Sequence, residues 1–240
     1  MLFGPKPFDG EKYIRLQTEA INERMKLFGG GKLYFEIGGK FLHDGHASRV
    51  LPGFDPASKL RIFGQFRDQM DILYCIAAPD YTAGRMWPGY GSYREKILSD
   101  LTDIANNNLP KPKIVINLYA KSDALSDLLI HLSGKYEVFF RYPIKGYPHD
   151  LKEVVSPDGY GRDDDIITKN PLVIVIAAGS NSGKMSTCLG QIYKDAKKGL
   201  DSGYAKHETF PIWNLPLHHP VNIAYEAATV DIGDRNCIDP

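Results

Sequence analysis

The sequence has no excess of charge of either sign, since its 240 residues include 29 Lys and Arg and 29 Asp and Glu. It has no basic tail or stripe, so nucleic acid is not the expected partner. Its apolar runs are too short to span a membrane. The first residues, MLFGPKPFDGEKY, have no apolar stretch of the signal-peptide kind. We therefore expect a cytoplasmic protein that binds neither nucleic acid nor membrane.

Cysteine is also scarce, with three residues scattered along the chain at Cys75, Cys188 and Cys237. An odd number of scattered cysteines indicates reduced thiols rather than a disulfide scaffold. The hydrophobic fraction of 43% is ordinary for a globular protein. A chain of this length can build one large core or two modest ones.

Apolar runs alternate with helical patterns through the first half of the chain. Asp9 is a candidate N-cap for a helix that ends at the three glycines 29–31. The pattern predicts strands at 32–37, 72–78, 113–119 and 136–142, and helices at 58–70, 93–104 and 124–132. This alternation indicates βαβ units, so we expect an α/β fold with a mostly parallel, Rossmann-like sheet.

The chain divides into three regions by composition. Residues 1–143 form the Rossmann-like α/β region, and 144–170 form a polar linker or loop whose acidic run, Asp163 to Asp165, is expected to be solvated. Residues 171–240 form a P-loop-like phosphate-binding region with a last helix near 221–229. No second apolar run follows in that region, so neighbouring strands come either from the N-terminal strands or from chain beyond this sequence. We expect an incomplete unit that self-associates.

The strongest motif is LVIVIAAGSNSGKMSTCLGQIY, at 172–193. Residues 172–178 are predicted to form a strand buried on both faces. A turn of small residues, Gly179 to Gly183, leads to Lys184 and a helical pattern. Backbone N–H groups of such a turn, the helix N-terminus and a lysine together are typical of a phosphate site.

The match to the P-loop pattern is imperfect. Ala178 stands at the first glycine position, and Met185 stands where a hydroxyl that binds Mg²⁺ is expected. The dinucleotide fingerprint fits less well, because only Gly179 and Gly183 are available. Asp201 has the spacing of the acidic residue that such a site needs, but the segment around it is not expected to be a buried strand. An ordinary βα turn, with small residues for close packing, is the alternative. We favour a site for ATP or another nucleotide with Mg²⁺, formed by Gly179, Ser180, Asn181, Ser182, Gly183, Lys184, Ser186 and Thr187.

Three functions follow from this motif and its surroundings. The first is phosphoryl transfer or nucleotide-driven ligation, with Lys184 neutralising charge and Ser186 or Thr187 near Mg²⁺. The second is a nucleotide or metabolite sensor without catalysis. The third is a metal-dependent hydrolase built on the histidines. Candidate substrate contacts are Arg49, Asn214 and Glu226; no residue is identified as catalytic.

The metal hypothesis has little support in the spacing of the histidines. His43 and His46 form a pair without further ligands. The other ligand-rich set fits no zinc template, so we expect no metal site there; its members are His207, Glu208, His218, His219 and Cys237. Asp80 follows a predicted strand at a position where a carboxylate can orient Mg²⁺.

Three segments resemble the bacterial domain-of-unknown-function 1846 family: HASRVLPGFDP (46–56), SGKMSTCLGQIY (182–193) and ETFPIWNLPLHHPVNIAYEAAT (208–229). The resemblance implies a cytoplasmic protein with an N-terminal Rossmann-like region and no established activity, in chains about twice as long. Some members carry the label "ATP-dependent zinc protease". His207 and Glu208 do not support that label, because the second His of an H-E-x-x-H helix is missing. The family supplies no catalytic residues.

Overall fold

The computed structural model describes residues 8–42, 45, 48, 53–87, 89–207, 217–220, 222–223 and 227. Its contacts divide the chain into two compact units. The first contains Met1–Asn22, Gly38–Gln65 and His207–Pro240, and the second contains Glu23–Ile37 and Phe66–Lys206. Each unit is a group of segments that lie far apart in the sequence.

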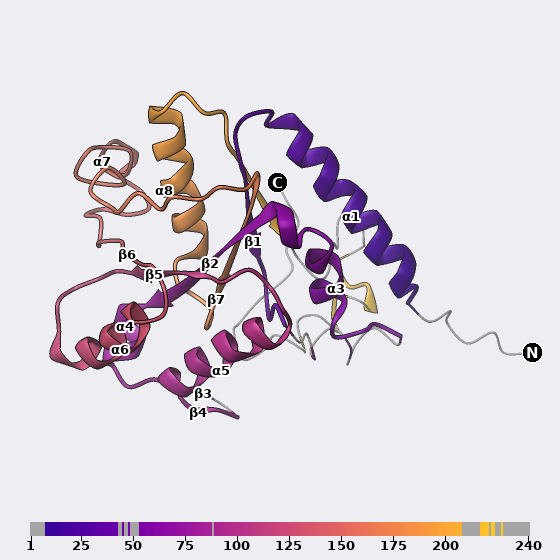
Figure 1. The fold of residues 1–240 in the computed structure, drawn as a ribbon, viewed down its shortest axis with the longest axis horizontal. Helices are drawn as coiled ribbons and strands as arrows, with labels where there is room; N and C mark the ends of the chain where they lie inside the picture. Colours follow the sequence, from indigo (N-terminus) through magenta and orange to yellow (C-terminus); the bar gives the residue numbers. More distant parts are fainter. Residues whose placement is uncertain are drawn as a thin grey trace, which may run out of the picture. The chain divides into compact units, whose positions relative to one another are not determined.

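A six-stranded sheet organises the second unit, in the order β6-β5-β2-β7-β1-β8 (Figure 1). Its strands are β1 Leu33–Ile37, β2 Met70–Ala77, β5 Lys113–Asn117, β6 Val138–Phe140, β7 Leu172–Ala177 and β8 Gly203–His207. The pairs β1–β7, β2–β7, β2–β5 and β5–β6 are all parallel. A separate antiparallel pair joins β3 Met86–Trp87 to β4 Gly91–Ser92. The expected α/β fold with a mostly parallel sheet is confirmed.

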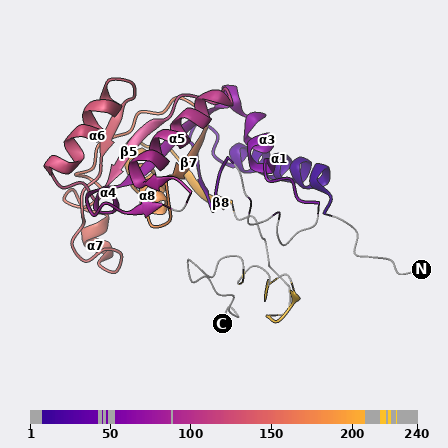
Figure 2. The ribbon, with the colours of Figure 1, turned by 90° about the horizontal axis from the view of Figure 1, so that it is seen from below.

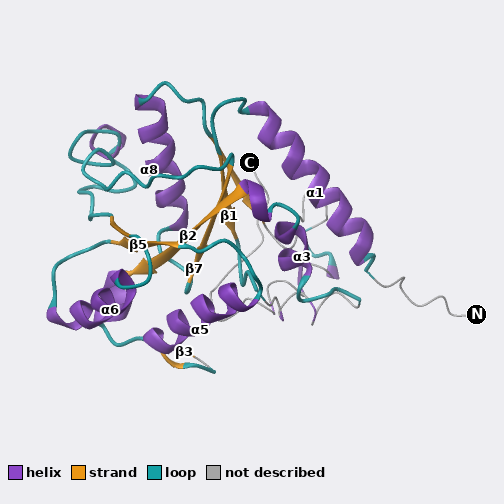
Figure 3. Cartoon of the chain, in the orientation of Figure 1, coloured by secondary structure: helices purple, strands orange, loops and turns teal. Residues whose placement is uncertain are grey.

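The helices largely follow the predicted pattern (Figure 3). Asp9 caps the first of them, because its Oδ1 accepts from the Lys12 N–H at 3.0 Å. Ser92 and Glu95 form a capping box at the start of α5. The helices whose bounds the described residues give are α1 Gly10–Leu27, α3 Ser58–Gly64, α4 Ala78–Thr82, α5 Tyr93–Asn106, α6 Asp123–Ser133, α7 Leu151–Val154 and α8 Lys184–Lys197, with a 3-10 turn at Arg67–Gln69.

Helices α8 and α5 cover opposite faces of the sheet, above and below it in Figure 1. Alternate strand residues such as Leu73 and Val175 join Cys188 of α8 in a buried apolar cluster. Tyr74, one residue along β2, points to the other face and donates to Asp100 of α5 at 2.7 Å. From below, α5 lies across the strands (Figure 2).

The connections of β2 and β7 diverge at their carboxyl ends. From β2 the chain continues through α5 to β5, whereas from β7 it continues through α8 to β8, on the far side of β1. Because β2 and β7 are neighbours, their carboxyl ends form a topological switch point. Open α/β sheets bind ligands at such points.

The structure departs from the expected elements in one helix and adds one edge strand. The helix expected at 58–70 ends at Gly64, and Met70 begins β2, where it pairs with Leu172. The segment after Asp201, where no buried strand was expected, forms the mostly half-buried edge strand β8, which extends the sheet. This strand was missed because it lies at the sheet edge and lacks an apolar run. The neighbours of β7 come from the N-terminal strands β1 and β2.

The polar segment 144–170 contributes to the core of the second unit. Ile166 is 2% exposed and belongs to the apolar cluster beneath α8. Asp163 is 4% exposed, so the expectation of a solvated acidic run is wrong for this residue. The buried guanidinium of Arg141 compensates the charge of Asp163. The spacing of residues in the sequence does not reveal this pair.

The first unit has its own small packing group. The rings of Phe8, Tyr13 and Phe54 contact one another, with centroids 5.3–5.9 Å apart. Lys59 is fully buried and its Nζ donates to the Gly38 carbonyl at 2.7 Å. Most of the helix expected at 221–229 lies outside the described residues. Within the described part of the chain, no helix has the length and hydropathy needed to cross a membrane.

Candidate functional site

The segment Gly179–Gly183, called the glycine turn below, joins β7 to α8 at the switch point. Asn181 and Gly183 have φ angles of 57° and 81°, in the left-handed region. A Cβ on Gly183 would lie 2.8 Å from Cγ of Asn117, and a Cβ on Gly179 would overlap the indole of Trp87. Both glycines are therefore required by close packing, and Gly183 also by its backbone conformation.

Side chains from neighbouring strands and helices hold the glycine turn in place. Asn117, the last residue of β5, donates from Nδ2 to the Ser182 carbonyl at 2.8 Å. The Ser182 hydroxyl donates to the Gly179 carbonyl at 2.9 Å. The Tyr93 hydroxyl lies 3.3 Å from the hydroxyl oxygen of Ser182. The turn is thus a built structure rather than a loose connection.

The start of α8 presents free donors at this turn. The first helical hydrogen bond runs from the Thr187 N–H to the Gly183 carbonyl at 2.9 Å. The backbone N–H groups of residues 183–186 have no acceptor among the described residues. Free N–H groups and the helix dipole make this end of α8 electropositive.

Lys184 and Glu36 face each other beside these donors. The Lys184 Nζ lies 4.0 Å from Glu36 Oε1, and the two side chains are 14% and 8% exposed. The other carboxylate oxygen of Glu36 accepts from the Tyr204 hydroxyl at 2.8 Å. At 4.0 Å the ion pair is too long for a hydrogen bond, so the ammonium has no hydrogen-bond acceptor among the described residues.

Arg141 lies beneath the first turn of α8 and is 3% exposed. Its Nε and Nη2 contact Oδ2 of Asp163 at 2.8 and 2.7 Å. Its Nη1 donates to Asn117 Oδ1 at 3.3 Å, Ser186 Oγ at 3.2 Å and Thr187 Oγ1 at 3.1 Å. The two hydroxyls considered for Mg²⁺ therefore lie beside a cation, and that disfavours a second cation there.

The two described thiols are part of the packing under this site. Burial raises the pKa of Cys75, and burial also raises the pKa of Cys188 well above its ordinary value. Both cysteines are free and buried. These groups stay protonated and unreactive at neutral pH.

Several residues predicted from sequence lie outside the described residues. They are Arg49, Asn214 and Glu226, together with His43, His46, Glu208 and Cys237. His207 is described, and its Nε2 lies 3.1 Å from the Tyr13 hydroxyl. No group of three or more metal-ligating side chains occurs in the described part of the chain. Asp80 lies in α4, where it pairs with Arg85 at 2.7 Å.

Sequence reasoning missed Glu36, Asn117 and Arg141 as neighbours of the glycine turn. A positional signal was available, because each is a polar residue within one position of the carboxyl end of an apolar strand. Parallel strands bring such residues to one edge of a sheet. The order of strands, which decides which of them meet, was not available from the sequence.

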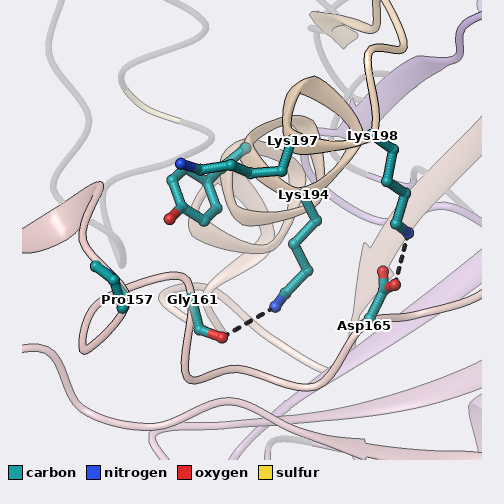
Figure 4. A pocket seen from close by; sticks show the side chains of 7 residues that line it. Pro157, Gly161, Asp165, Lys194, Lys197 and Lys198 are labelled. Atoms are coloured by element: carbon teal, nitrogen blue, oxygen red, sulfur yellow. Dashed lines mark hydrogen bonds and ion pairs between the residues drawn. The ribbon is translucent and has the colours of Figure 1, made fainter.

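A shallow pocket of about 330 Å³ lies at the other end of α8 (Figure 4). Lys194 donates there to the Gly161 carbonyl at 3.3 Å, and Lys198 pairs with Asp165 at 2.5 Å. Lys197 is thirteen positions after Lys184 along α8, a rise of about 20 Å, so the pocket lies near the end of the helix that is remote from the glycine turn. Its lining residues are Pro157, Gly161, Asp165, Tyr193, Lys194, Lys197 and Lys198.

Comparison with known proteins agrees with the resemblance seen in the sequence. The family model "Domain of unknown function DUF1846, N-terminal" matches residues 6–240. The chain is 46% identical over 235 residues to a UPF0371 protein of Streptococcus equi subsp. equi, and 45% identical over 236 residues to one of Streptococcus sanguinis. Each match covers 97% of this chain and 47% of the relative, so the chain spans about half the length of these curated relatives. The chain therefore belongs to the domain of unknown function 1846 family.

Proposed function

We propose that the glycine turn and the first turn of α8 bind a phosphorylated small molecule, in the first place a nucleotide. The site is P-loop-like in its order of strand, turn, lysine and helix, and it belongs to a Rossmann-like sheet. The observation that carries the proposal is the position of the turn at the switch point between β2 and β7, with Lys184 beside it. We extend the same proposal to the longer relatives, whose activity would then use this site.

The groups around the turn have the chemistry that phosphate oxygens require. Four consecutive backbone N–H groups, from residues 183–186, have no acceptor among the described residues, and each can donate to a phosphate oxygen. The Lys184 ammonium adds a full charge with three further donors. Asn117 contacts the carbonyl of Ser182 and Tyr93 contacts its hydroxyl. Both side chains therefore position the donors of the turn rather than contact the ligand.

Phosphoryl transfer or nucleotide-driven ligation is the reaction class that this arrangement supports. Lys184 would neutralise charge that develops on the transferred or leaving phosphate, and the N–H groups would hold its oxygens. A sensor that binds a nucleotide without turnover needs the same groups. Formation of a product from ATP separates the enzyme from the sensor.

Titration calorimetry with ATP, GTP, NAD and inorganic phosphate tests the proposal directly. We expect at least one of these ligands to bind the wild-type chain. Lys184→Ala should remove a charge-assisted contact worth about 1.5–3 kcal/mol, and weaken binding about ten- to hundredfold. Lys197→Ala is the matched control, because Lys197 belongs to the same helix at its opposite end.

Two results would overturn the proposal. One is that no phosphate-bearing ligand binds the wild type. The other is that a ligand binds and that Lys184→Ala leaves its affinity equal to that of Lys197→Ala. Circular dichroism of both variants establishes that they are folded.

A further inference from the structure

Glu36 is a nearly buried carboxylate, and one of its oxygens accepts no hydrogen bond from a described residue. It lies on β1, and its side chain is 8% exposed. Oε2 accepts from Tyr204, whereas Oε1 accepts no hydrogen bond from a described residue and faces Lys184 at 4.0 Å. A buried charge is costly unless it is paired and hydrogen-bonded, so Oε1 lacks the close partner that its burial demands.

The charges near the glycine turn cancel one another. Among the described residues there, Lys184 faces Glu36, Arg141 pairs with Asp163, and Arg85 pairs with Asp80. The helix N-terminus adds only about half a positive charge. A nucleoside di- or triphosphate brings several negative charges, and some of them would lie near the carboxylate of Glu36.

We propose that Glu36 makes ligand binding at the glycine turn depend on a divalent cation, held between Glu36 Oε1 and the phosphate oxygens. The inference rests on the proposed function of the turn. Mg²⁺ is commonly held by one or two carboxylates together with phosphates of the substrate and waters. The preferred ligand is then a nucleoside di- or triphosphate complexed with Mg²⁺, rather than the free anion.

The alternative position for the cation is less favourable. Ser186 Oγ and Thr187 Oγ1 both accept from the Arg141 guanidinium, at 3.2 and 3.1 Å. A metal ion at either hydroxyl would lie against that positive charge. Lys184 likewise lies 4.0 Å from Glu36 Oε1, but there the carboxylate itself supplies a negative charge that offsets the ammonium, and Oε1 accepts no hydrogen bond from a described residue.

The test compares ATP binding with Mg²⁺ and with a chelator in wild type, Glu36→Gln and Glu137→Gln. Glu137 is the control, because its side chain is 65% exposed and pairs with Lys113 at the start of β5. We expect Mg²⁺ to strengthen binding to the wild type by at least about tenfold. Glu36→Gln should lose most of this enhancement and bind metal-free ATP at least as tightly as the wild type. Glu137→Gln should behave as the wild type does.

A second variant covers the case in which Glu36→Gln does not fold. Glu36→Asp keeps the charge that faces Lys184 and withdraws the carboxylate by one methylene, so an intermediate Mg²⁺ enhancement is expected. The inference is overturned if Glu36→Gln keeps the full wild-type enhancement of ATP binding by Mg²⁺. If Glu36→Gln does not fold, the same result with Glu36→Asp overturns it.

The result also separates this inference from the proposed function. If ATP binds the wild type equally well with and without Mg²⁺, the role of Glu36 is wrong and the phosphate site stands. If the wild type binds neither ATP nor any other phosphate ligand, both proposals are wrong.

Discussion

The side-chain amide of Asn117 bridges the glycine turn and the buried Arg141. Its Nδ2 donates to the Ser182 carbonyl at 2.8 Å, and its Oδ1 accepts from Arg141 Nη1 at 3.3 Å. The Thr187 hydroxyl also donates to Oδ1, at 3.2 Å. One amide thereby connects the end of β5, the turn after β7 and the first turn of α8.

Asn117→Ala should destabilise the protein by about 1–3 kcal/mol, because it leaves buried polar partners unpaired. Phosphate affinity should also fall, since the Ser182 carbonyl is released and the turn loosens. Urea unfolding and calorimetry measure the two effects. Asn22→Ala is the control: Asn22 is exposed and bonds the Thr18 carbonyl on a helix surface, so its removal should cost about 0.5 kcal/mol or less. Equal stability of the two variants would contradict the role given to Asn117.

Gly183→Ala should destabilise the turn for two reasons. The left-handed φ of 81° costs a non-glycine residue about 1–2 kcal/mol, and the new Cβ would lie 2.8 Å from Asn117. Gly64→Ala provides the contrast, since Gly64 is helical and its Cβ would meet nothing within 4 Å. That change should be neutral or stabilise by up to about 1 kcal/mol. A thermal shift of the same sign and size in both variants would refute the prediction.

Arg141→Met should be the most damaging of these substitutions. It leaves the Asp163 carboxylate, whose side chain is 1% exposed, without its counter-ion. Breaking a buried pair in this way costs about 3–5 kcal/mol. The double variant Arg141→Met with Asp163→Leu should recover part of the loss, because no unpaired charge remains. Arg15→Ala, which breaks an exposed pair with Glu19, should change stability by less than about 1 kcal/mol.

Alkaline pH should destabilise the fold through buried tyrosines. Burial raises the pKa of Tyr160 to about 12, and it also raises the pKa values of Tyr34, Tyr74 and Tyr93. An unfolded tyrosine loses its proton near pH 10. The unfolded state therefore binds fewer protons than the native state above that pH, and stability falls as pH rises from about 10 towards 12.

Ultraviolet titration of the folded protein measures this effect, since the phenolate absorbs at longer wavelength. A group of the 14 tyrosines should ionise late, together with unfolding. Tyr160→Phe should reduce the fall of stability with pH in urea unfolding above pH 10. Simultaneous ionisation of all tyrosines near pH 10 in the folded state would show that they are not protected.

Local patterns were sufficient for most elements of the fold. The runs ILYCIAA and LVIVIA are continuous and apolar, and they became the central strands β2 and β7 because strands of a parallel sheet are buried on both faces. The helix expected at 58–70 was too long, because Phe66 and Met70 continue a helical spacing although Met70 belongs to the sheet. Tertiary pairing overrides a short periodic pattern in such a case.

The sequence by itself determined the α/β class, the mostly parallel sheet and the turn that delivers Lys184 to the start of a helix, because these depend on periodicity, small residues and helix signals close together in the chain. Only the tertiary structure decided that β7 lies between β1 and β2, and therefore that Glu36, Asn117 and Arg141 surround the turn. Strand order depends on which surfaces pack best over long separations, and no local pattern records it. Glu36 and Lys184 are 148 residues apart in the sequence, and Arg141 and Thr187 are 46 apart; the strand order and the packing of α8 on the sheet bring each pair together.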